Sequence, residues 1–168
     1  MAWTKSGPPV TGAAYAERVD SRRSDQRPAL IVSACLLGVE CNHEGRAAKV
    51  SLRETLSERY RIVPVCPEVL GGLAAPRAAA EIQPDGSVVN VEGVDVTGAY
   101  RRGAEAAVRV ALASGARRAV LKARSPSCGS SGVYDGTFSG VLVDGSGTAA
   151  SRLRDAGLEV SSEEDPLP

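Results

Sequence analysis

The chain has 168 residues, of which 43% are hydrophobic and 24% are charged. These values are typical of one globular domain and exclude a wholly disordered or fibrous protein. Its 20 basic and 20 acidic residues cancel, a balance that does not favour binding to a nucleic-acid backbone.

The start of the chain lacks the apolar core of a signal peptide, and no run approaches the roughly 20 apolar residues that span a bilayer. We therefore expect a cytoplasmic protein with a small molecule as its ligand and with no membrane or nucleic-acid partner. Because thiols stay reduced in the cytosol, the four cysteines are expected as ligands, reactive groups or core residues rather than as disulfides.

Three regions are predicted along the chain. Residues 1–28 are rich in Gly, Pro, Ser and Arg, which predicts a loosely packed N-terminal extension with a weak helical stretch over residues 13–24. A single α/β domain is expected over residues 29–161. The last residues, 162–168, are expected to form a solvated acidic tail.

The first half of the domain predicts two buried strands joined through a helix. Ala29–Ala34 is a continuous apolar run of strand length, as expected for a strand that is buried on both faces. Ser51–Tyr60 predicts a helix, in which Ser51 and Glu54 have the spacing of a capping box. Arg61–Val65 predicts the second buried strand.

The second half continues the alternation of strands and helices. Its predicted elements, in order, are a hairpin over residues 81–91 that turns at Asp85–Gly86, a helix over Thr97–Ser114 closed by Gly115, a strand over Arg118–Ala123, a helix over Gly147–Ala156 and a strand over Leu158–Ser161. This alternation predicts an α/β fold with a mainly parallel sheet, flanked by helices and carrying a small hairpin excursion.

Three cysteines lie at junctions between a predicted strand and the loop after it: Cys35, Cys66 and Cys128. In open α/β sheets, ligands bind beyond the carboxyl ends of the strands, so thiols that are far apart in the chain could converge there. Each cysteine is flanked by Gly, Pro or Ser, whose amides and hydroxyls can donate to thiolates or cluster sulfides. The competing interpretation is that each is a small buried hydrophobic residue. The spacing contains no CxxC pair and by itself names no metal.

Five segments within residues 29–161 are distinctive: SACLLGVEC, VPVCPEVLGGLAAPRAAAEI, GVDVTGAYRRGAE, VLKARSPSCGSSGVYDGTFSG and GSGTAASRLRDAGLEV. Together they resemble the bacterial thiouracil desulfurase family, formerly domain of unknown function 523. The resemblance implies a Rossmann-like fold and a 4Fe-4S cluster held by three protein cysteines, which by motif match are Cys35, Cys66 and Cys128. It also implies release of sulfide from 2-thiouracil or a related thiolated pyrimidine. The expected partner is a small thiolated base or nucleoside, and the sequence does not decide between them.

Such a cluster leaves one iron with an open position that can act as a Lewis acid toward a soft sulfur atom. Water must then attack the ring carbon. Glu68, two residues after a proposed ligand, is the first candidate for activating that water or moving protons, and Ser125 is placed to orient substrate or to donate to developing negative charge. The alternatives are that Glu68 only binds the adjacent loop and that Ser125 is a turn residue before proline.

Four further residues are expected to contact the substrate: Ser127, Arg77, Glu81 and Tyr134. Ser127 shares its role and its alternative with Ser125. Arg77 and Glu81 lie in the segment that the resemblance places at the pocket edge, although either could form a surface salt bridge instead. Tyr134 begins a predicted turn and could stack on a flat ring.

Cys41 and His43 carry no assigned role. After Cys41 the relatives usually continue with Arg-Tyr-Asp-Gly, whereas this chain has Asn42-His43-Glu44-Gly45, and that departure leaves substrate choice open. Cys41 could be a fourth ligand, a sulfur acceptor or a loop thiol, the last being favoured. His43 could be solvated, or could replace the usual tyrosine at the pocket mouth.

Two other classes of function compete with the desulfurase. One is a non-catalytic, zinc-stabilised binding module that uses all four cysteines, in which a closed ligand set leaves no reactive position. The other is a thiol redox enzyme, which the absence of a CxxC pair disfavours.

Overall fold

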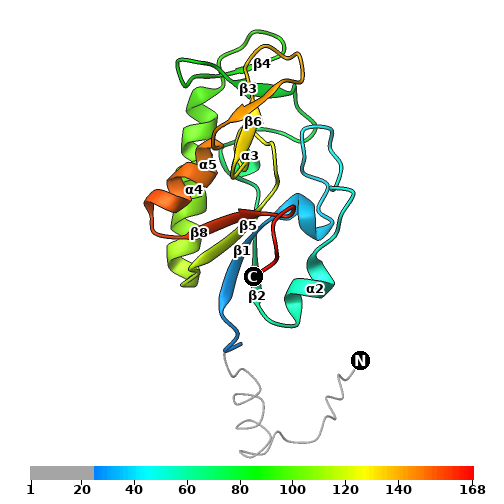
Figure 1. Cartoon of the computed structure of the whole chain (residues 1–168), viewed down its shortest axis with the longest axis vertical. Helices are drawn as coiled ribbons and strands as arrows, with labels where there is room; N and C mark the ends of the chain where they lie inside the picture. Colours follow the sequence, from blue (N-terminus) through cyan, green and yellow to red (C-terminus); the bar gives the residue numbers. More distant parts are fainter. Residues whose placement is uncertain (1–24) are drawn as a thin grey trace, which may run out of the picture.

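The computed structural model describes residues 25–168 of the chain (Figure 1). The predicted extension over residues 1–28, with its helical stretch, lies outside the described residues apart from residues 25–28, which are exposed. The first strand, β1 (Ala29–Ser33), begins directly after them.

The centre of the fold is a four-stranded parallel sheet in the order β2-β1-β5-β8. The strands that accompany β1 are β2 (Arg61–Val65), β5 (Arg118–Leu121) and β8 (Glu159–Ser162). Within the sheet, Val32 of β1 is paired with Pro64 on one side and with Val120 on the other. This arrangement confirms the predicted α/β class with a mainly parallel sheet.

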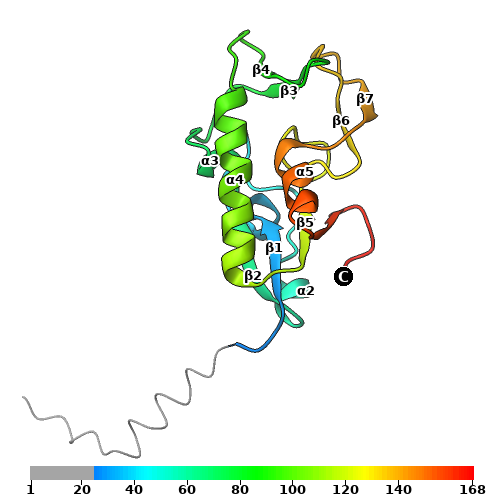
Figure 2. The same cartoon turned by 90° about the vertical axis from the view of Figure 1, so that its left-hand side faces the viewer.

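Helices cover both faces of the sheet. The 3-10 helix η1 (Ala34–Leu37) and α2 (Arg53–Ser57) lie on one face, and α4 (Thr97–Ser114) and α5 (Thr148–Asp155) lie on the other. Figure 2 shows α4 and α5 in front of the sheet. A short helix, α3 (Pro67–Leu70), follows β2 and packs against α4. None of the helices in this described part of the chain is long and apolar enough to cross a membrane.

Alternation of side chains along β1 builds a core on each face. Ile31 belongs to the core on the side of α4 and α5, together with Leu153. Leu30 and Val32 belong to the other core, together with Leu56 of α2. All five residues of β1 are buried, as predicted, because a central strand has both faces covered. Burial of a side chain of this size contributes about 1.5–3 kcal/mol to folding.

Two details of the predicted elements are wrong. β2 is not buried on both faces, because it is an edge strand, and its Pro64 is exposed where the missing N–H costs no sheet hydrogen bond. α2 has Leu52 as its N-cap and no side-chain capping bond, so the predicted capping box of Ser51 and Glu54 does not form. Burial of Leu52 fixes the start of the helix instead, and its N–H donates to the carbonyl of Leu36 at 2.8 Å.

Two antiparallel hairpins lie beyond the carboxyl edge of the sheet (Figure 1). β3 (Ala80–Ile82) and β4 (Val88–Asn90) form the predicted hairpin, and its turn contains Gly86, whose φ of 82° suits glycine. β6 (Gly132–Tyr134) and β7 (Leu142–Asp144) form a second hairpin that the sequence pattern does not reveal. With three residues each, its strands are too short to show an alternating pattern.

The C-terminal residues are not all solvated, as the predicted acidic tail would require. β8 extends to Ser162, which is buried, and the Glu163 side chain is only 8% exposed. The Glu163 carboxylate forms an ion pair with Lys122 and accepts a hydrogen bond from the N–H of Ala123 at 2.7 Å. The prediction is therefore wrong for Glu163, because the segment after β5 supplies partners that composition cannot reveal.

α3 and α4 approach each other so closely that only glycine fits between them. A Cβ atom on Gly103 of α4 would overlap the carbonyl oxygen of Pro67, and one on Gly71 would overlap the carbonyl oxygen of Ala99. α4 itself has the predicted bounds and ends at Gly115, whose φ is 71°. The close contact fixes α3, which begins directly after Cys66, against the first turns of α4.

Replacing Gly103 with alanine is expected to lower the free energy of unfolding by about 1–3 kcal/mol, because the added methyl group must push α3 away from α4. Gly98→Ala in the same helix is the matched control, since its Cβ would meet only the end of the Arg102 side chain at 3.4 Å. Urea unfolding of both variants measures the difference. Equal stability of the two variants would contradict the role given to Gly103.

Candidate active site

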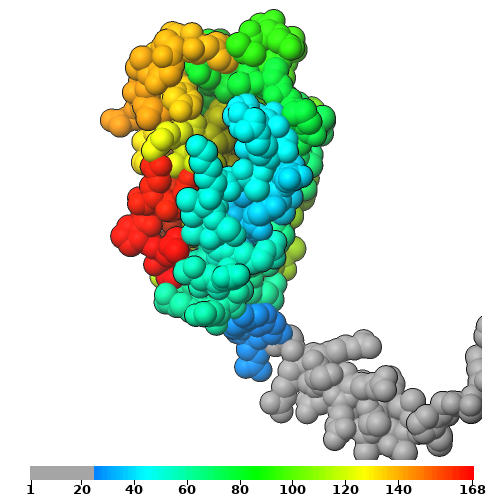
Figure 3. All heavy atoms as spheres, turned by 90° about the vertical axis from the view of Figure 1, so that its right-hand side faces the viewer, coloured from blue at the N-terminus to red at the C-terminus, as the bar shows by residue number. Residues whose placement is uncertain are grey.

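A cavity of about 450 Å³ lies at the carboxyl edge of the parallel sheet. Its walls come from the ends of β1, β2 and β5, from α3, from the first turn of α4 and from both hairpins. In Figure 3 the surface is hollowed between the loop that follows η1 and the segment that follows β5. Most of the predicted site residues line this cavity: Cys35, Cys66, Cys128, Glu68, Arg77, Glu81, Ser125 and Tyr134.

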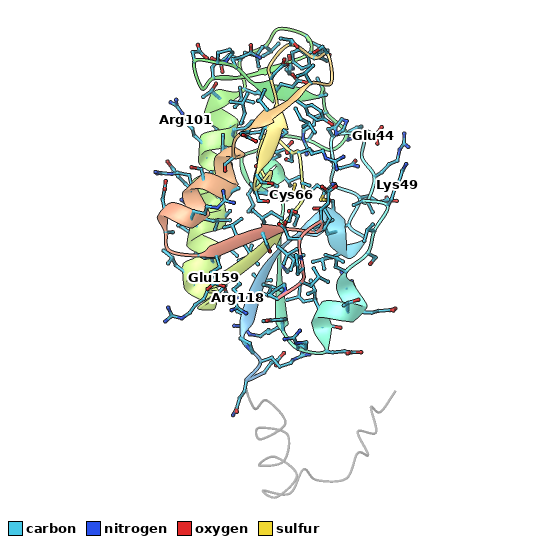
Figure 4. The ribbon with its side chains drawn as sticks, viewed as in Figure 1. Glu44, Lys49, Cys66, Arg101, Arg118 and Glu159 are labelled. Carbon is cyan, nitrogen blue, oxygen red and sulfur yellow. The ribbon has the colours of Figure 1, made fainter. Side chains whose placement is uncertain are left out.

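Three thiols gather on one wall of the cavity. Cys35 lies in η1 directly after β1, Cys66 follows β2 as the N-cap of α3, and Cys41 belongs to the loop between them. Cys41 lies beside Cys35 and Cys66, close enough for both to influence its thiol. The Cys66 thiol also donates to the Cys41 carbonyl at 3.7 Å. Figure 4 shows Cys66 at the upper end of the central sheet, beneath the hairpins.

These contacts hold two of the thiols in their protonated form. The neighbouring Cys35 is the largest influence on Cys41 and raises the pKa of its thiol to about 11. The neighbouring Cys41, followed by burial, raises the pKa of the Cys66 thiol well above its ordinary value. Metal binding to such thiols releases protons, because the thiolate is the form that ligates.

Cys128 reaches the cavity from the turn that follows β5. The Ser125 hydroxyl oxygen accepts hydrogen bonds from the N–H groups of Ser127 and Cys128, each at 3.1 Å. The turn packs against the N-cap of α5, where a Cβ atom on Gly147 would lie 2.8 Å from the Cys128 nitrogen. Burial is the main cause that raises the pKa of the Cys128 thiol, to about 12. The backbone around Cys128 is thus fixed from two sides.

Among residues 25–168, no three His, Cys, Asp or Glu side chains have the close arrangement that holds a single metal ion. Four cysteines nevertheless line one cavity, and cysteine thiolates are the ligands that iron–sulfur clusters use. A cluster of several irons is wider than one ion, so its ligands lie further apart. The chemistry of the donor set therefore fits a cluster. Cys41 lies in a loop, as expected, but the structure also brings it to the cavity.

Glu68 is buried in the cavity wall and has three neighbours. Its Oε2 atom accepts a hydrogen bond from Arg77 Nε at 2.6 Å, and its Oε1 atom lies 3.5 Å from the Ser125 hydroxyl. The third neighbour is Tyr100 in the first turn of α4, whose phenol pKa is raised by burial and then by the Glu68 carboxylate. Nothing in the sequence distinguishes Tyr100 from a core tyrosine.

Arg77 forms a buried ion pair with Glu68, not the surface salt bridge that was the alternative expectation. Its side chain is only 9% exposed. Its Nη1 and Nη2 atoms donate to the Cys41 carbonyl at 3.1 and 3.2 Å. Arg77 is therefore built into the wall of the cavity.

The remaining predicted residues are placed differently. Glu81 is buried and accepts a hydrogen bond from the N–H of Phe138 at 2.9 Å, which ties β3 to the second hairpin. Tyr134, expected to begin a turn, is the last residue of β6 and lines the cavity. His43 is exposed and also lines it. Ser127 is fully buried beneath the start of α5 and is not among the lining residues, so the structure does not bring it to the cavity.

Comparison with known proteins gives consistent matches. The model of the 2-thiouracil desulfurase family matches residues 30–165 of the chain. The uncharacterized protein YbbK of Bacillus subtilis strain 168 is 40% identical, in an alignment that covers 81% of this chain and 96% of the relative. Among solved structures, the 4Fe-4S-dependent thiouracil desulfidase TudS is similar, with 43% identity, a TM-score of 0.77 and coverage of 82% of this chain and 92% of the other.

Replacing Ser125 with alanine is expected to lower the free energy of unfolding by about 1–2 kcal/mol, because two main-chain N–H groups lose their acceptor. Ser125→Thr keeps the oxygen and is expected to lose less. Ser151→Ala, at an exposed position of α5, is the matched control and should not lower stability. Denaturant unfolding compares the three variants, and an unchanged midpoint for Ser125→Ala would contradict this account of the turn.

Proposed function

The chain belongs to the 2-thiouracil desulfurase family, and from this membership we propose that it is an iron–sulfur enzyme that removes sulfur as sulfide from a thiolated pyrimidine such as 2-thiouracil. The observation that carries this function is the convergence of cysteines from three strand ends on one cavity, which also holds a buried carboxylate. The zinc-stabilised binding module is not favoured, because the family and the related structure are those of an enzyme.

We propose Cys35, Cys66 and Cys128 as the three protein ligands of a 4Fe-4S cluster. Each follows a different strand, and all three line the cavity. A cluster with only three protein ligands supplies an iron with an open position, which is a Lewis acid for a soft thiocarbonyl sulfur. In this assignment Cys41 is the fourth thiol of the cavity and not a ligand.

Glu68 is proposed to take the proton of the water that attacks the ring carbon. Its Oε2 atom is occupied by Arg77, so Oε1, beside the Ser125 hydroxyl, is the oxygen available for this proton. Ser125 is proposed to orient the substrate, and its oxygen also fixes the turn that carries Cys128. One hydroxyl group therefore connects the proposed base with a proposed ligand.

The hairpins supply further contacts for a flat ring. A thiolated base or nucleoside presents ring N–H donors and an aromatic face. Glu81 is proposed to accept from a ring N–H through Oε1, since Oε2 already accepts from Phe138. Tyr134 is proposed to stack on the ring from its place at the end of β6.

Anaerobic reconstitution is expected to give brown protein that contains iron and releases sulfide from 2-thiouracil. Cys35→Ser, Cys66→Ser and Cys128→Ser are each expected to lose bound iron and sulfide release, whereas Cys41→Ser should keep its iron, because it lies outside the proposed ligand set. Iron and sulfide analysis of the purified variants measures both properties.

Loss of iron from Cys41→Ser would contradict the three-cysteine assignment. One zinc ion without iron in the unaltered protein would contradict the proposed function and support the zinc-stabilised module. A panel of thiolated bases and nucleosides, assayed with the same preparation, identifies the preferred substrate.

Glu68→Gln is expected to lower kcat by roughly 100-fold or more, because the amide cannot accept the proton of the attacking water. Bound iron and its visible absorbance should stay unchanged. Glu54→Gln, at an exposed position of α2, is the matched control and should keep full activity. Steady-state assays of both variants give the answer, and a kcat for Glu68→Gln within twofold of the unaltered enzyme would rule out the proposed role.

A further inference from the structure

Arg77 joins two separate parts of the cavity wall. Its Nε atom donates to Glu68 Oε2 at 2.6 Å. Its Nη1 atom donates to the carbonyls of Cys41 and Ala74 at 3.1 and 2.9 Å, and its Nη2 atom donates to Cys41 at 3.2 Å. The main-chain N–H of Arg77 also donates to the carbonyl of His43 at 2.8 Å. One residue thus binds both α3 and the loop that carries Cys41.

The guanidinium group has little left to offer a substrate. All three of its nitrogens donate to acceptors of the protein itself, and its side chain is 9% exposed. Four of its five N–H groups are used in these bonds, so a single N–H of Nη2 remains for a substrate. The geometry therefore disfavours the direct substrate contact predicted for Arg77.

What Arg77 does fix is the direction of the Glu68 carboxylate. Close packing of Gly103 on Pro67 holds α3 against α4, so the backbone beneath Glu68 has little freedom to adjust. The carboxylate can still rotate about its own side-chain bonds. With Oε2 bound to Arg77, Oε1 is turned toward the Ser125 hydroxyl at 3.5 Å.

We propose that Arg77 is a positioning residue for the reaction: it orients the Glu68 carboxylate and fixes the position of the Cys41–His43 loop relative to that carboxylate. This inference rests on the proposed function, in which Glu68 takes a proton from water. The planar fork of arginine is required, because its nitrogens point in different directions from one rigid group and so bind Glu68 and Cys41 together. A lysine keeps the charge but provides only one nitrogen.

Arg77→Lys is therefore expected to lower kcat by about 10- to 100-fold while KM changes less than about twofold, since misdirected proton transfer costs rate and not binding. In a Glu68→Gln background the same substitution should have no further effect on kcat. Arg53→Lys is the matched control, because Arg53 Nε donates to the Leu37 carbonyl at 3.1 Å outside the cavity. Its kcat and KM should equal those of the unaltered enzyme.

Steady-state kinetics and iron content of the reconstituted full-length variants decide the matter. A raised KM with unchanged kcat would show that Arg77 contacts substrate, and loss of activity in proportion to iron would show a structural role only. An additive effect of the two substitutions would show that Arg77 does not act through Glu68. Each result overturns the proposal.

Two further controls separate the possible failures. If Arg77→Lys does not fold, Arg77→Gln is the second variant, because one amide nitrogen replaces the three guanidinium nitrogens that bind Glu68, Cys41 and Ala74. If the unaltered, iron-loaded enzyme releases no sulfide from any thiolated base or nucleoside, the proposed function fails, and the positioning role fails with it. Active unaltered enzyme with unaffected Arg77 variants overturns the positioning role alone.

Discussion

The pairing of β1 with β2 on one side and with β5 on the other decides where the chemistry of this chain is located. Because the three strands run in the same direction, their carboxyl ends meet at one edge, and the segment after each of them carries a cysteine. Cys35 and Cys128 are far apart in the sequence yet line one cavity. Pairing of the strands therefore brings these cysteines to the same edge of the sheet.

Beside these thiols the fold retains a buried ion pair, Glu68 with Arg77. Transfer of two charges out of water costs free energy, and apolar replacements of such pairs are often as stable or more stable. Stability alone therefore does not explain the pair. The orientation of the carboxylate explains the pair, because a carboxylate with one oxygen fixed presents its other oxygen in a defined direction, here toward Ser125. The same guanidinium holds the Cys41 carbonyl, so carboxylate and thiol loop share one support.

Features that depend on local pattern could be predicted from the sequence, and features that depend on distant partners could not. The end of α4 at Gly115 and the burial of β1 follow from a local glycine and a local apolar run. The exposure of Pro64 depends on how many strands join the sheet, and burial of Glu163 depends on Lys122 after another strand. The location of the cavity was predictable, because ligands in parallel α/β sheets bind beyond the carboxyl ends of the strands whatever the loops do. The position of Cys41 was not, because it depends on how its loop folds back toward the cavity.

The loop after Cys41 is held in shape by hydrogen bonds with Asn42 and Arg77. The Asn42 side-chain oxygen accepts the N–H groups of Glu44 and Arg46 at 3.0 and 2.7 Å, and Arg77 donates to the carbonyls of Cys41 and His43. These bonds do not use the side chain of His43, which is exposed at the cavity wall. A change of side chain at position 43 would therefore leave these bonds in place and alter the surface of the cavity, whereas a change at Asn42 would remove two of them.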